Sequence, residues 1–303
     1  AKLPYPIRQA WEVLGTISPD IAARTGLSLD TMVTLGIHDS NASILPHLAS
    51  KVSHDFVLNS TGTWCVLMHP VDKYGFEPDE LGKVVFFNRS AWNTPIKTAI
   101  FLGGKEYETW MDIIAKSSSA KSSRQLPKPD KKDYLRVLEE CNCFILPEIV
   151  PGSGQFPGSV ARAVQGGISY PLSDIEEGKY KIAFLQDAKI AQAVLNLSIV
   201  LQTEVALQRT NIKPGTEILT EGGFRSNTDY NMLLGSCFPG NVVYLTDLQE
   251  ATSFGAAMTA LTALKKIDPR ALSRYIHIEK VLVPSMFAPE RLSAYRNAWH
   301  AQI

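Results

Sequence analysis

Several short stretches of this sequence combine residue types that could bind a phosphorylated ligand. Asn-Ser-Thr-Gly-Thr-Trp at residues 59–64 and Gly-Gly-Lys at residues 103–105 place glycine among small or polar residues. A further stretch runs from a short strand into Glu-Gly-Gly at residues 221–223 and on to Asn227. Glycine lets a backbone pass close to a ligand, and a following helix offers free N–H groups to an anion. Together these stretches favour a nucleotide site, whereas each alone could be an ordinary strand-to-helix turn.

Another stretch, Gly-Ile-His-Asp-Ser at residues 36–40, places a carboxylate at the end of an expected strand. A carboxylate in that position could take the proton from a hydroxyl that attacks a phosphate. Asp39 is therefore a candidate general base. It could instead be the N-cap of the helix expected to follow, or serve in both ways.

The composition limits the classes of partner. At 303 residues the chain is long enough for one large or two ordinary domains. Basic and acidic residues balance at 30 each, so no overall field favours nucleic acid or an anionic membrane. The longest apolar runs, such as residues 193–201, are interrupted by polar residues and stay short of the roughly 18 residues that cross a bilayer. We expect neither a nucleic-acid partner nor a membrane span.

The cysteines indicate a reducing compartment. Four of them in a chain of this length are too few for a disulfide framework, which fits the cytoplasm. Cys141 and Cys143 could suggest a metal site, but no second ligand pair follows at a useful spacing. We expect free thiols at Cys65, Cys141, Cys143 and Cys237.

The elements that must position these stretches alternate between strand and helix. Strands are expected at residues 31–37, 56–58, 64–68, 84–92, 96–102, 144–147, 216–221 and 242–245. Helices are expected at residues 7–14, 21–25, 41–48, 106–115, 134–141, 179–210, 229–238 and 250–264. Ser18 is a predicted N-cap ahead of Pro19. The alternation indicates α/β layers, with residues 179–210 as the structural spine.

Two segments are expected to be irregular. Residues 116–132, rich in Ser, Lys and Pro, predict a solvated linker to which we assign no chemistry. Residues 151–158 form a Gly- and Pro-rich loop that could cover a ligand or only turn a corner. The stripe of Tyr107, Trp110 and Ile114 at helical spacing is expected in the core.

In their order and spacing these stretches resemble the FGGY carbohydrate kinases. Residues 36–39 are similar to the turn that bears the family's catalytic aspartate, and residues 60–64 to its second phosphate loop. Residues 221–227 are similar to its adenosine motif, and residues 250–257 to its closing signature. The resemblance implies an actin-like ATPase (ribonuclease H-like) domain, an α/β fold with a mixed sheet flanked by helices.

The resemblance also implies an incomplete enzyme. The family's first phosphate loop, of Asp-Ile-Gly-Thr type, is not found in this chain, and residues 151–158 replace its usual Gly-Glu-Arg loop. Residues 1–54 would be the last piece of an N-terminal sugar-binding domain, and residues 55–303 the C-terminal nucleotide-binding domain. The His-Asp pair at residues 38 and 39 is most similar to rhamnulose and fuculose kinases.

The activity implied is ATP-dependent phosphorylation of a sugar hydroxyl, on a ketose or deoxyketose. Asp39 would be the base, and His38 could donate to a sugar oxygen or be satisfied by the backbone. Thr61, Gly62 and Thr63 would offer hydroxyls and N–H groups to the β- and γ-phosphates, or form a plain hairpin turn.

The remaining implied contacts concern the nucleoside. Gly103 or Gly104 would let the nucleotide lie against the backbone, and Gly222 and Gly223 would flank the α-phosphate. Asn227 would bond the base or ribose, or only cap a helix. Mg²⁺ is expected to accompany ATP without protein ligands that can be named. A homodimer is possible, and the residues do not decide the oligomeric state.

Two other functions are consistent with the residues. A non-catalytic nucleotide- or sugar-responsive module would keep the fold without turnover, and the missing first phosphate loop favours it if the native protein begins near residue 1. An ATPase chaperone or cytoskeletal relative would lack the Asp39 turn, although kinship of fold alone does not exclude it.

Overall fold

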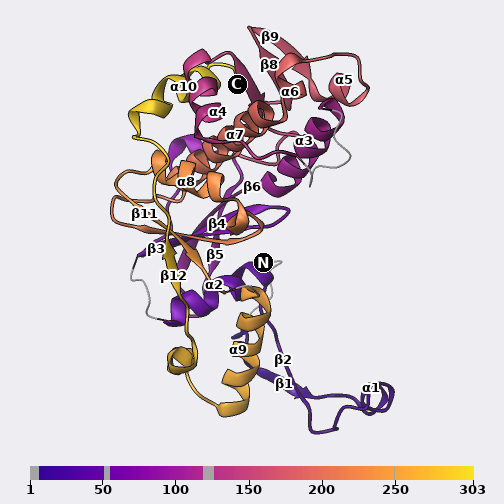
Figure 1. The fold of residues 1–303 in the computed structure, drawn as a ribbon. Coiled ribbons are helices and arrows are strands. Elements are labelled where there is room, and N and C mark those ends of the chain that lie inside the picture. The colour runs from indigo at the N-terminus through magenta and orange to yellow at the C-terminus, as the bar shows by residue number, and fades with distance from the viewer. Residues whose placement is uncertain (1–6, 51–54, 119–125, 249) are drawn as a thin grey trace.

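The computed structural model describes residues 7–50, 55–118, 126–248 and 250–303. A seven-stranded sheet forms its centre, in the order β12-β11-β10-β3-β4-β6-β5 (Figure 1). The parallel strands are β3 (Phe56–Thr61), β10 (Glu217–Gly222) and β11 (Val242–Thr246). The strands paired antiparallel to their neighbours are β4 (Cys65–Pro70), β5 (Val85–Arg89), β6 (Pro95–Phe101) and β12 (Lys280–Leu282). The expected mixed sheet is confirmed.

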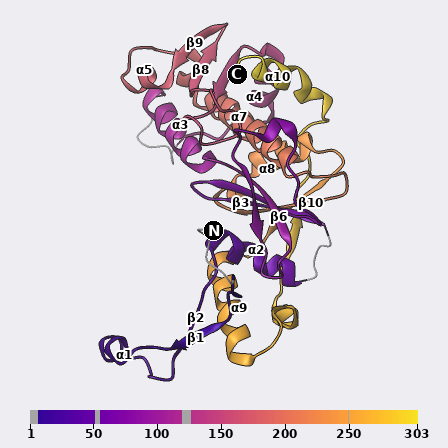
Figure 2. The same ribbon diagram turned by 180° about the vertical axis from the view of Figure 1, so that it is seen from behind.

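Alternate residues of the central strands face two different helical layers. On β3, Phe56 and Leu58 belong to a cluster with Ile44 of α2 (Asp39–Ser50), whereas Val57 belongs to the large core on the other face. This alternation is the period of two that a strand imposes. Figures 1 and 2 show α2 and α9 (Ala251–Lys265) together on one side of the sheet, and the remaining large helices on the other.

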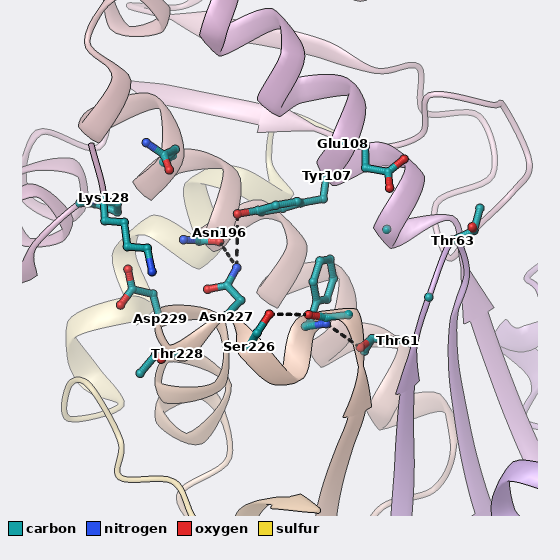
Figure 3. A pocket seen from close by; sticks show the side chains of 16 residues that line it. Thr61, Thr63, Tyr107, Glu108, Lys128, Asn196, Ser226, Asn227, Thr228 and Asp229 are labelled. Carbon is teal, nitrogen blue, oxygen red and sulfur yellow. Dashed lines mark hydrogen bonds between the residues drawn. The ribbon is translucent and has the colours of Figure 1, made fainter. Parts of the chain in front are cut away.

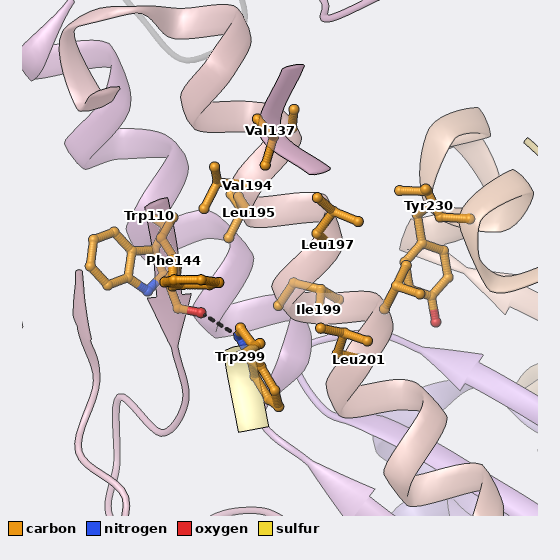
Figure 4. Packing of buried hydrophobic residues seen from close by; sticks show 14 of the residues in the cluster. Trp110, Val137, Phe144, Val194, Leu195, Leu197, Ile199, Leu201, Tyr230 and Trp299 are labelled. Carbon is orange, nitrogen blue, oxygen red and sulfur yellow. Dashed lines mark hydrogen bonds between the residues drawn. The ribbon is translucent and has the colours of Figure 1, made fainter. Parts of the chain in front are cut away.

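The large core is built around α7 (Ala188–Arg209), a helix of 22 residues. Its neighbours are α3 (Gly103–Ser117), α4 (Lys131–Glu140) and α8 (Thr228–Cys237) (Figure 4). By length and mean hydropathy α7 could cross a membrane, but 94% of its 18-residue apolar window is buried inside the protein. A helix that is apolar all round and covered by its own chain is a core helix, and the predicted spine at residues 179–210 is confirmed over this range.

A small antiparallel sheet adjoins the core. It contains β7 (Cys143–Leu146), β8 (Arg162–Gln165) and β9 (Ile168–Pro171), followed by the short helices α5 (Leu172–Glu176) and α6 (Ala183–Gln186). The last helix, α10 (Glu290–His300), covers β7. Tyr295 Oη donates to the Cys143 carbonyl at 2.9 Å. Trp299 Nε1 donates to the Ile145 carbonyl, also at 2.9 Å (Figure 4). Three 3₁₀ turns complete the described elements: η1 (Pro78–Glu80), η3 (Gly223–Ser226) and η4 (Pro269–Tyr275).

The first described residues form a separate two-stranded sheet of β1 (Val13–Thr16) and β2 (Met32–Thr34). The helix expected at residues 7–14 is therefore wrong, since residues 7–12 are turn and irregular structure and Val13 pairs with Thr34. The predicted cap of α1 (Pro19–Thr25) is confirmed, because Ser18 Oγ accepts the Ile21 N–H at 3.4 Å. The domain boundary expected at residue 54 lies outside the described residues, as does part of the linker expected at 116–132.

Helices α2 and α9 touch through a glycine. A Cβ atom on Gly255 would lie 1.9 Å from the carbonyl oxygen of Ala42. That close approach fixes α2, and with it Asp39 at the first position of the helix. Gly255 falls in the segment similar to the family's closing signature. Its close contact with Ala42 shows that this glycine serves the packing of α9 against α2.

A pair of buried carboxyl groups joins α3 to the loop at residues 151–158. Glu106 and Glu148 are each 2% exposed. Glu106 accepts a bond from Gln202 Nε2 at 2.7 Å, and Glu148 accepts the N–H groups of Gly152 at 2.6 Å and Phe156 at 2.9 Å. Burial, together with the charge of Glu148, raises the pKa of Glu106 from 4.5 to about 8. The carboxyl of Glu106 is therefore protonated at neutral pH.

We expect Gly255→Ala to lower the free energy of unfolding by about 1–3 kcal/mol, because the added methyl group must push α9 away from α2. Chemical denaturation monitored by circular dichroism would measure the change. Ser253→Ala, on an exposed face of the same helix, is the control and should change stability by less than about 0.5 kcal/mol. Equal stability of the two variants would contradict this account of the helix contact.

The Glu106 carboxyl predicts a stability that falls with rising pH. Its folded pKa is raised, so between about pH 4.5 and pH 8 the folded protein holds a proton that the unfolded chain releases. Glu106→Gln keeps the acceptor for Gln202 and removes the titration. We expect the variant to gain on the order of a few kcal/mol over the wild type at pH 8, and little at pH 5.

Urea unfolding at both pH values would test this. Asp112→Asn, an exposed acid on the same helix, is the control and should leave the pH dependence in place. If the free energy of unfolding of Glu106→Gln varied with pH in parallel with that of the wild type, the raised pKa of Glu106 would be contradicted.

Candidate functional site

Three of the predicted turns meet at one edge of the central sheet. In the strand register, Gly222 lies beside Thr61, Thr61 beside Cys65, and Cys65 beside Phe101. Strands β3, β10 and β6 therefore end in one row. The turns that follow them, at residues 62–64, 223–226 and 102–104, form what we call the rim. Ligands of α/β sheets bind outside the carboxyl ends of such strands.

Three glycines at or next to the rim are required by the protein's own packing. A Cβ atom on Gly103 would lie 2.6 Å from Cys65 Sγ and from the Phe101 ring. A Cβ atom on Gly222, where φ is +77°, would lie 2.0 Å from the Thr61 carbonyl oxygen. A Cβ on Gly104 would lie 1.9 Å from the Gly62 carbonyl oxygen. By contrast, a Cβ on Gly223 or Gly62 would meet only ordinary contacts, the nearest at 3.6 and 3.8 Å. The glycine character of these last two positions therefore has no cause in the packing of the chain.

A pocket of about 580 Å³ opens beside the rim, and we call it the amide pocket (Figure 3). One end is formed by rim residues, namely Thr61, Gly62, Thr63, Gly104 and Gly223. Toward the other end lie Asn196, Asn227, Lys128 and Asp229. Six of the eight predicted nucleotide-binding residues line this pocket. Gly103 and Gly222 do not, so of the pair Gly103 and Gly104 it is Gly104 that lines the pocket.

The amide end is held by a chain of hydrogen bonds (Figure 3). Asn227 Nδ2 donates to Asn196 Oδ1 at 2.9 Å, and Asn196 Nδ2 donates to Tyr134 Oη at 2.7 Å. Tyr134 in turn donates to Asp229 Oδ2 at 2.9 Å. Asn227 Oδ1 accepts the Tyr230 N–H at 3.1 Å, so Asn227 is the N-cap of α8 as well as a pocket residue. Such a network leaves the amides of the pocket in fixed orientations.

Tyr107 was expected in the core; it is half-buried against the core and also lines the amide pocket. Trp110 and Ile114, further along α3, are buried as expected. The Tyr107 ring meets that of Phe224 edge-on, with centroids 5.3 Å apart. Burial and the nearby charge of Asp229 raise the pKa of Tyr107 to about 12, so its hydroxyl stays a neutral hydrogen-bond donor.

The Thr61 hydroxyl was expected to face the phosphates, but its hydrogen bonds are made within the protein. It is part of a residue only 2% exposed, donates to the Glu221 carbonyl and accepts the Phe224 N–H at 2.9 Å. The Gly62 N–H closes the hairpin turn by a bond within the chain. The side chain at the tip that is exposed for a ligand is that of Thr63.

A second hollow, of about 420 Å³, lies on the other side of the hairpin tip, and we call it the Asp39 pocket. Gly62 and Thr63 line both pockets. The Asp39 side chain is 75% exposed, its Oδ1 accepts the Ser40 N–H at 2.6 Å, and it lies 2.9 Å from His38 Nδ1. Because the contact is with the next residue, Asp39 does not span the first turn as an N-cap does. His38, expected to face a sugar, touches this carboxylate.

Other residues of these pockets could not be found from the sequence. Lys128 and Pro129 line the amide pocket, although they lie in the segment to which no chemistry was assigned. Trp64, 40% exposed, lines the Asp39 pocket. The loop at residues 151–158 lines neither pocket, and Gln155 Nε2 ties it to the carbonyls of residues 84 and 100. These bonds hold the loop against β5 and β6.

The cysteines and acids of the described ranges offer no cage for a metal. No group of three His, Cys, Asp or Glu side chains comes together there. Cys65, Cys143 and Cys237 are buried, and all four thiols are free.

Comparison with known proteins agrees with this geometry. Residues 53–269 match the family model described as "Carbohydrate kinase FGGY, C-terminal domain". A sequence comparison with curated proteins returned no match. Among solved structures, a carbohydrate kinase from Novosphingobium aromaticivorans is 26% identical with a TM-score of 0.67. A gluconate kinase from Lactobacillus acidophilus (18%, 0.68) and a Plasmodium falciparum glycerol kinase with ADP (14%, 0.61) share the fold.

These alignments cover 98, 97 and 98% of this chain but only 58, 55 and 55% of the three solved chains. The chain therefore spans little more than half the length of its structural relatives. With the family model matched over most of its residues and the sheet order and rim in place, the chain belongs to the FGGY carbohydrate kinase family and has the α/β, actin-like fold of that family.

Proposed function

We propose that the protein, completed by a sugar-binding domain, transfers the γ-phosphate of ATP to a sugar hydroxyl with Asp39 as general base. The observation that carries this proposal is the hairpin tip at Gly62 and Thr63, which forms a wall of both the amide pocket and the Asp39 pocket. A phosphate at this tip would be reached by a nucleotide from one side and by an acceptor hydroxyl from the other. Since the chain covers 58% or less of its solved relatives, the substrate is part of the proposal. Following the His-Asp pair, we propose a ketose or deoxyketose.

In this proposal the nucleotide lies along the amide pocket. The adenosine occupies the end where the amides of Asn196 and Asn227 are fixed, with Tyr107 beside it. The phosphates run past Gly223 toward the hairpin tip, where backbone without bulky side chains allows close approach. The volume of about 580 Å³ lies within the range of cofactor pockets.

The chemistry takes place at the tip. The sugar oxygen attacks the γ-phosphorus, the bond from that phosphorus to the β,γ-bridging oxygen breaks, and ADP leaves. The hydroxyl proton moves to the Asp39 carboxylate, which His38 holds from 2.9 Å. Trp64 lies in the same pocket and offers an aromatic face to the apolar side of the sugar.

A magnesium ion would neutralise charge on the triphosphate during transfer. The described residues form no cage for it, which suits an ion that keeps several waters and binds through phosphates. Our proposal therefore assigns the ion to the nucleotide, and no residue of this chain as a required ligand.

Substitutions at two neighbouring glycines distinguish an effect on ligand binding from an effect on folding. Gly223→Ala adds a methyl group that the free protein accommodates, so we expect an unchanged melting temperature and an ATP Kd raised on the order of tenfold. Gly222→Ala forces a side chain onto the Thr61 carbonyl at positive φ and should lower the free energy of unfolding by roughly 2 kcal/mol or more. Calorimetric titration with ATP and thermal unfolding would measure both. Unchanged ATP affinity in a folded Gly223→Ala protein would remove this glycine from the site.

For the base, we expect Asp39→Asn in the full-length enzyme to lower kcat by about 10²–10⁴ while leaving the ATP Kd nearly unchanged. A coupled assay of ADP release and a nucleotide titration would measure the two quantities. Asp20→Asn, a similarly exposed acid on α1, is the control and should turn over like the wild type. Wild-type turnover in Asp39→Asn would reject Asp39 as the base, and ATP binding without turnover in the wild type would favour the non-catalytic module.

A further inference from the structure

A third hollow, of about 550 Å³, lies next to the Asp39 pocket, and we call it the arginine pocket. His38 lines both of them. Its walls come from residues 7–10, from residues 36–38 before α2 together with Asn41 in its first turn, and from the end of β5 and the β5–β6 turn (Arg89, Ser90, Ala91 and Asn93). The pocket therefore joins the segment that carries the proposed base to a hairpin of the nucleotide-binding sheet.

The pocket is lined by positively charged side chains and by no carboxylate. Arg8 and Arg89 line it, and none of its lining residues is Asp or Glu. Arg8 has a carboxylate partner, since its Nε lies 2.8 Å from Glu12 Oε2. Arg89 is exposed, and within the described ranges it has no acidic partner within 4.0 Å. Among the residues that the structure describes, no carboxylate balances the charge of Arg89 in this pocket.

The position of Arg89 is fixed by the hairpin that carries it. Arg89 is the last residue of β5 and pairs with Pro95 of β6. The turn between them is closed by the Ser90 N–H, which donates to the Thr94 carbonyl at 2.9 Å. Trp92 of the same turn packs against the α2 and α9 cluster. A guanidinium on such a support can hold an anion in one place relative to Asp39.

The other lining groups fit a polyhydroxy chain. The amides of Gln9, Asn41 and Asn93 can donate to and accept from hydroxyl groups. One unbalanced guanidinium matches one negative charge, and its planar fork matches a carboxylate. The carboxylate would also lie away from the negative charge of Asp39.

We propose that the sugar phosphorylated here is a sugar acid, whose carboxylate binds Arg89 while the hydroxyl to be phosphorylated faces Asp39. This inference rests on the proposed kinase function, but it replaces the neutral ketose or deoxyketose suggested by the His-Asp pair with a sugar that carries a carboxylate. Neutral ketoses of the same chain length become the poorer substrates.

The test uses the full-length enzyme and measures ADP release with aldonates and keto-aldonates against neutral ketoses of equal carbon number. We expect a higher kcat/KM for the acids. Arg89→Gln should raise KM for the acids on the order of 10- to 100-fold, with kcat/KM for neutral ketoses not lowered. Arg136→Gln, on α4 and paired only with Glu140, is the matched control and should behave like the wild type.

The possible outcomes separate the two proposals. If neutral ketoses are used as well as the acids, or if Arg89→Gln lowers kcat/KM for both classes equally, the inference is wrong and the kinase function stands. If neither class releases ADP, the kinase function fails. In that case the Kd of an aldonate, measured by calorimetry, decides the inference. The inference holds only if Arg89→Gln raises that Kd about tenfold or more.

Discussion

The buried carboxylate of Glu221 joins the elements on which the site depends. Its Oε1 lies 2.6 Å from His47 Nε2 of α2 and accepts the Thr246 hydroxyl of β11 at 2.8 Å. The main chain of the same residue accepts the Thr61 hydroxyl of β3. Both His47 and Glu221 are 3% exposed. One buried polar cluster therefore sets the position of the helix that begins with Asp39 relative to the hairpin tip.

Such a cluster specifies geometry more than it adds stability. Burying a charged or polar group costs free energy that its partners only offset, and removing one partner leaves the other unsatisfied. Here each partner comes from a different element, so the bonds form only when α2, β3, β10 and β11 are in register. The close contacts at Gly222 and Gly255 depend on the same arrangement, because they bring backbone atoms of these elements together.

The sequence was sufficient to predict six of the seven central strands and the rim, but not the edge strand β12. Alternating residues and glycine pairs mark β3, β4 and β10 and the turns after them, because these signals are local. They did not separate glycines by role: Gly222 and Gly104 are demanded by backbone contacts, whereas Gly223 and Gly62 are not. That distinction depends on strands that are distant in the sequence.

What was missed depends on long-range contacts. Strands β8 and β9 have only four residues each, and pairing with one another and with β7 gives them their structure. The helix expected at residues 7–14 does not form, because pairing of Val13 with Thr34, 21 residues away, overrides the local pattern. Lys128 lines the amide pocket, but it lies in a polar segment that contains no motif. Only the folded structure shows that it is near the site.

The measurement that tests the central claim most directly is a crystal structure of the full-length enzyme with a non-hydrolysable ATP analogue and a sugar. We predict the γ-phosphate at the tip formed by Gly62 and Thr63, adenosine between Asn227 and Tyr107, and the sugar hydroxyl in hydrogen-bond reach of Asp39. A triphosphate bound away from that tip, or an Asp39 carboxylate separated from the γ-phosphate by the hairpin, would contradict the account.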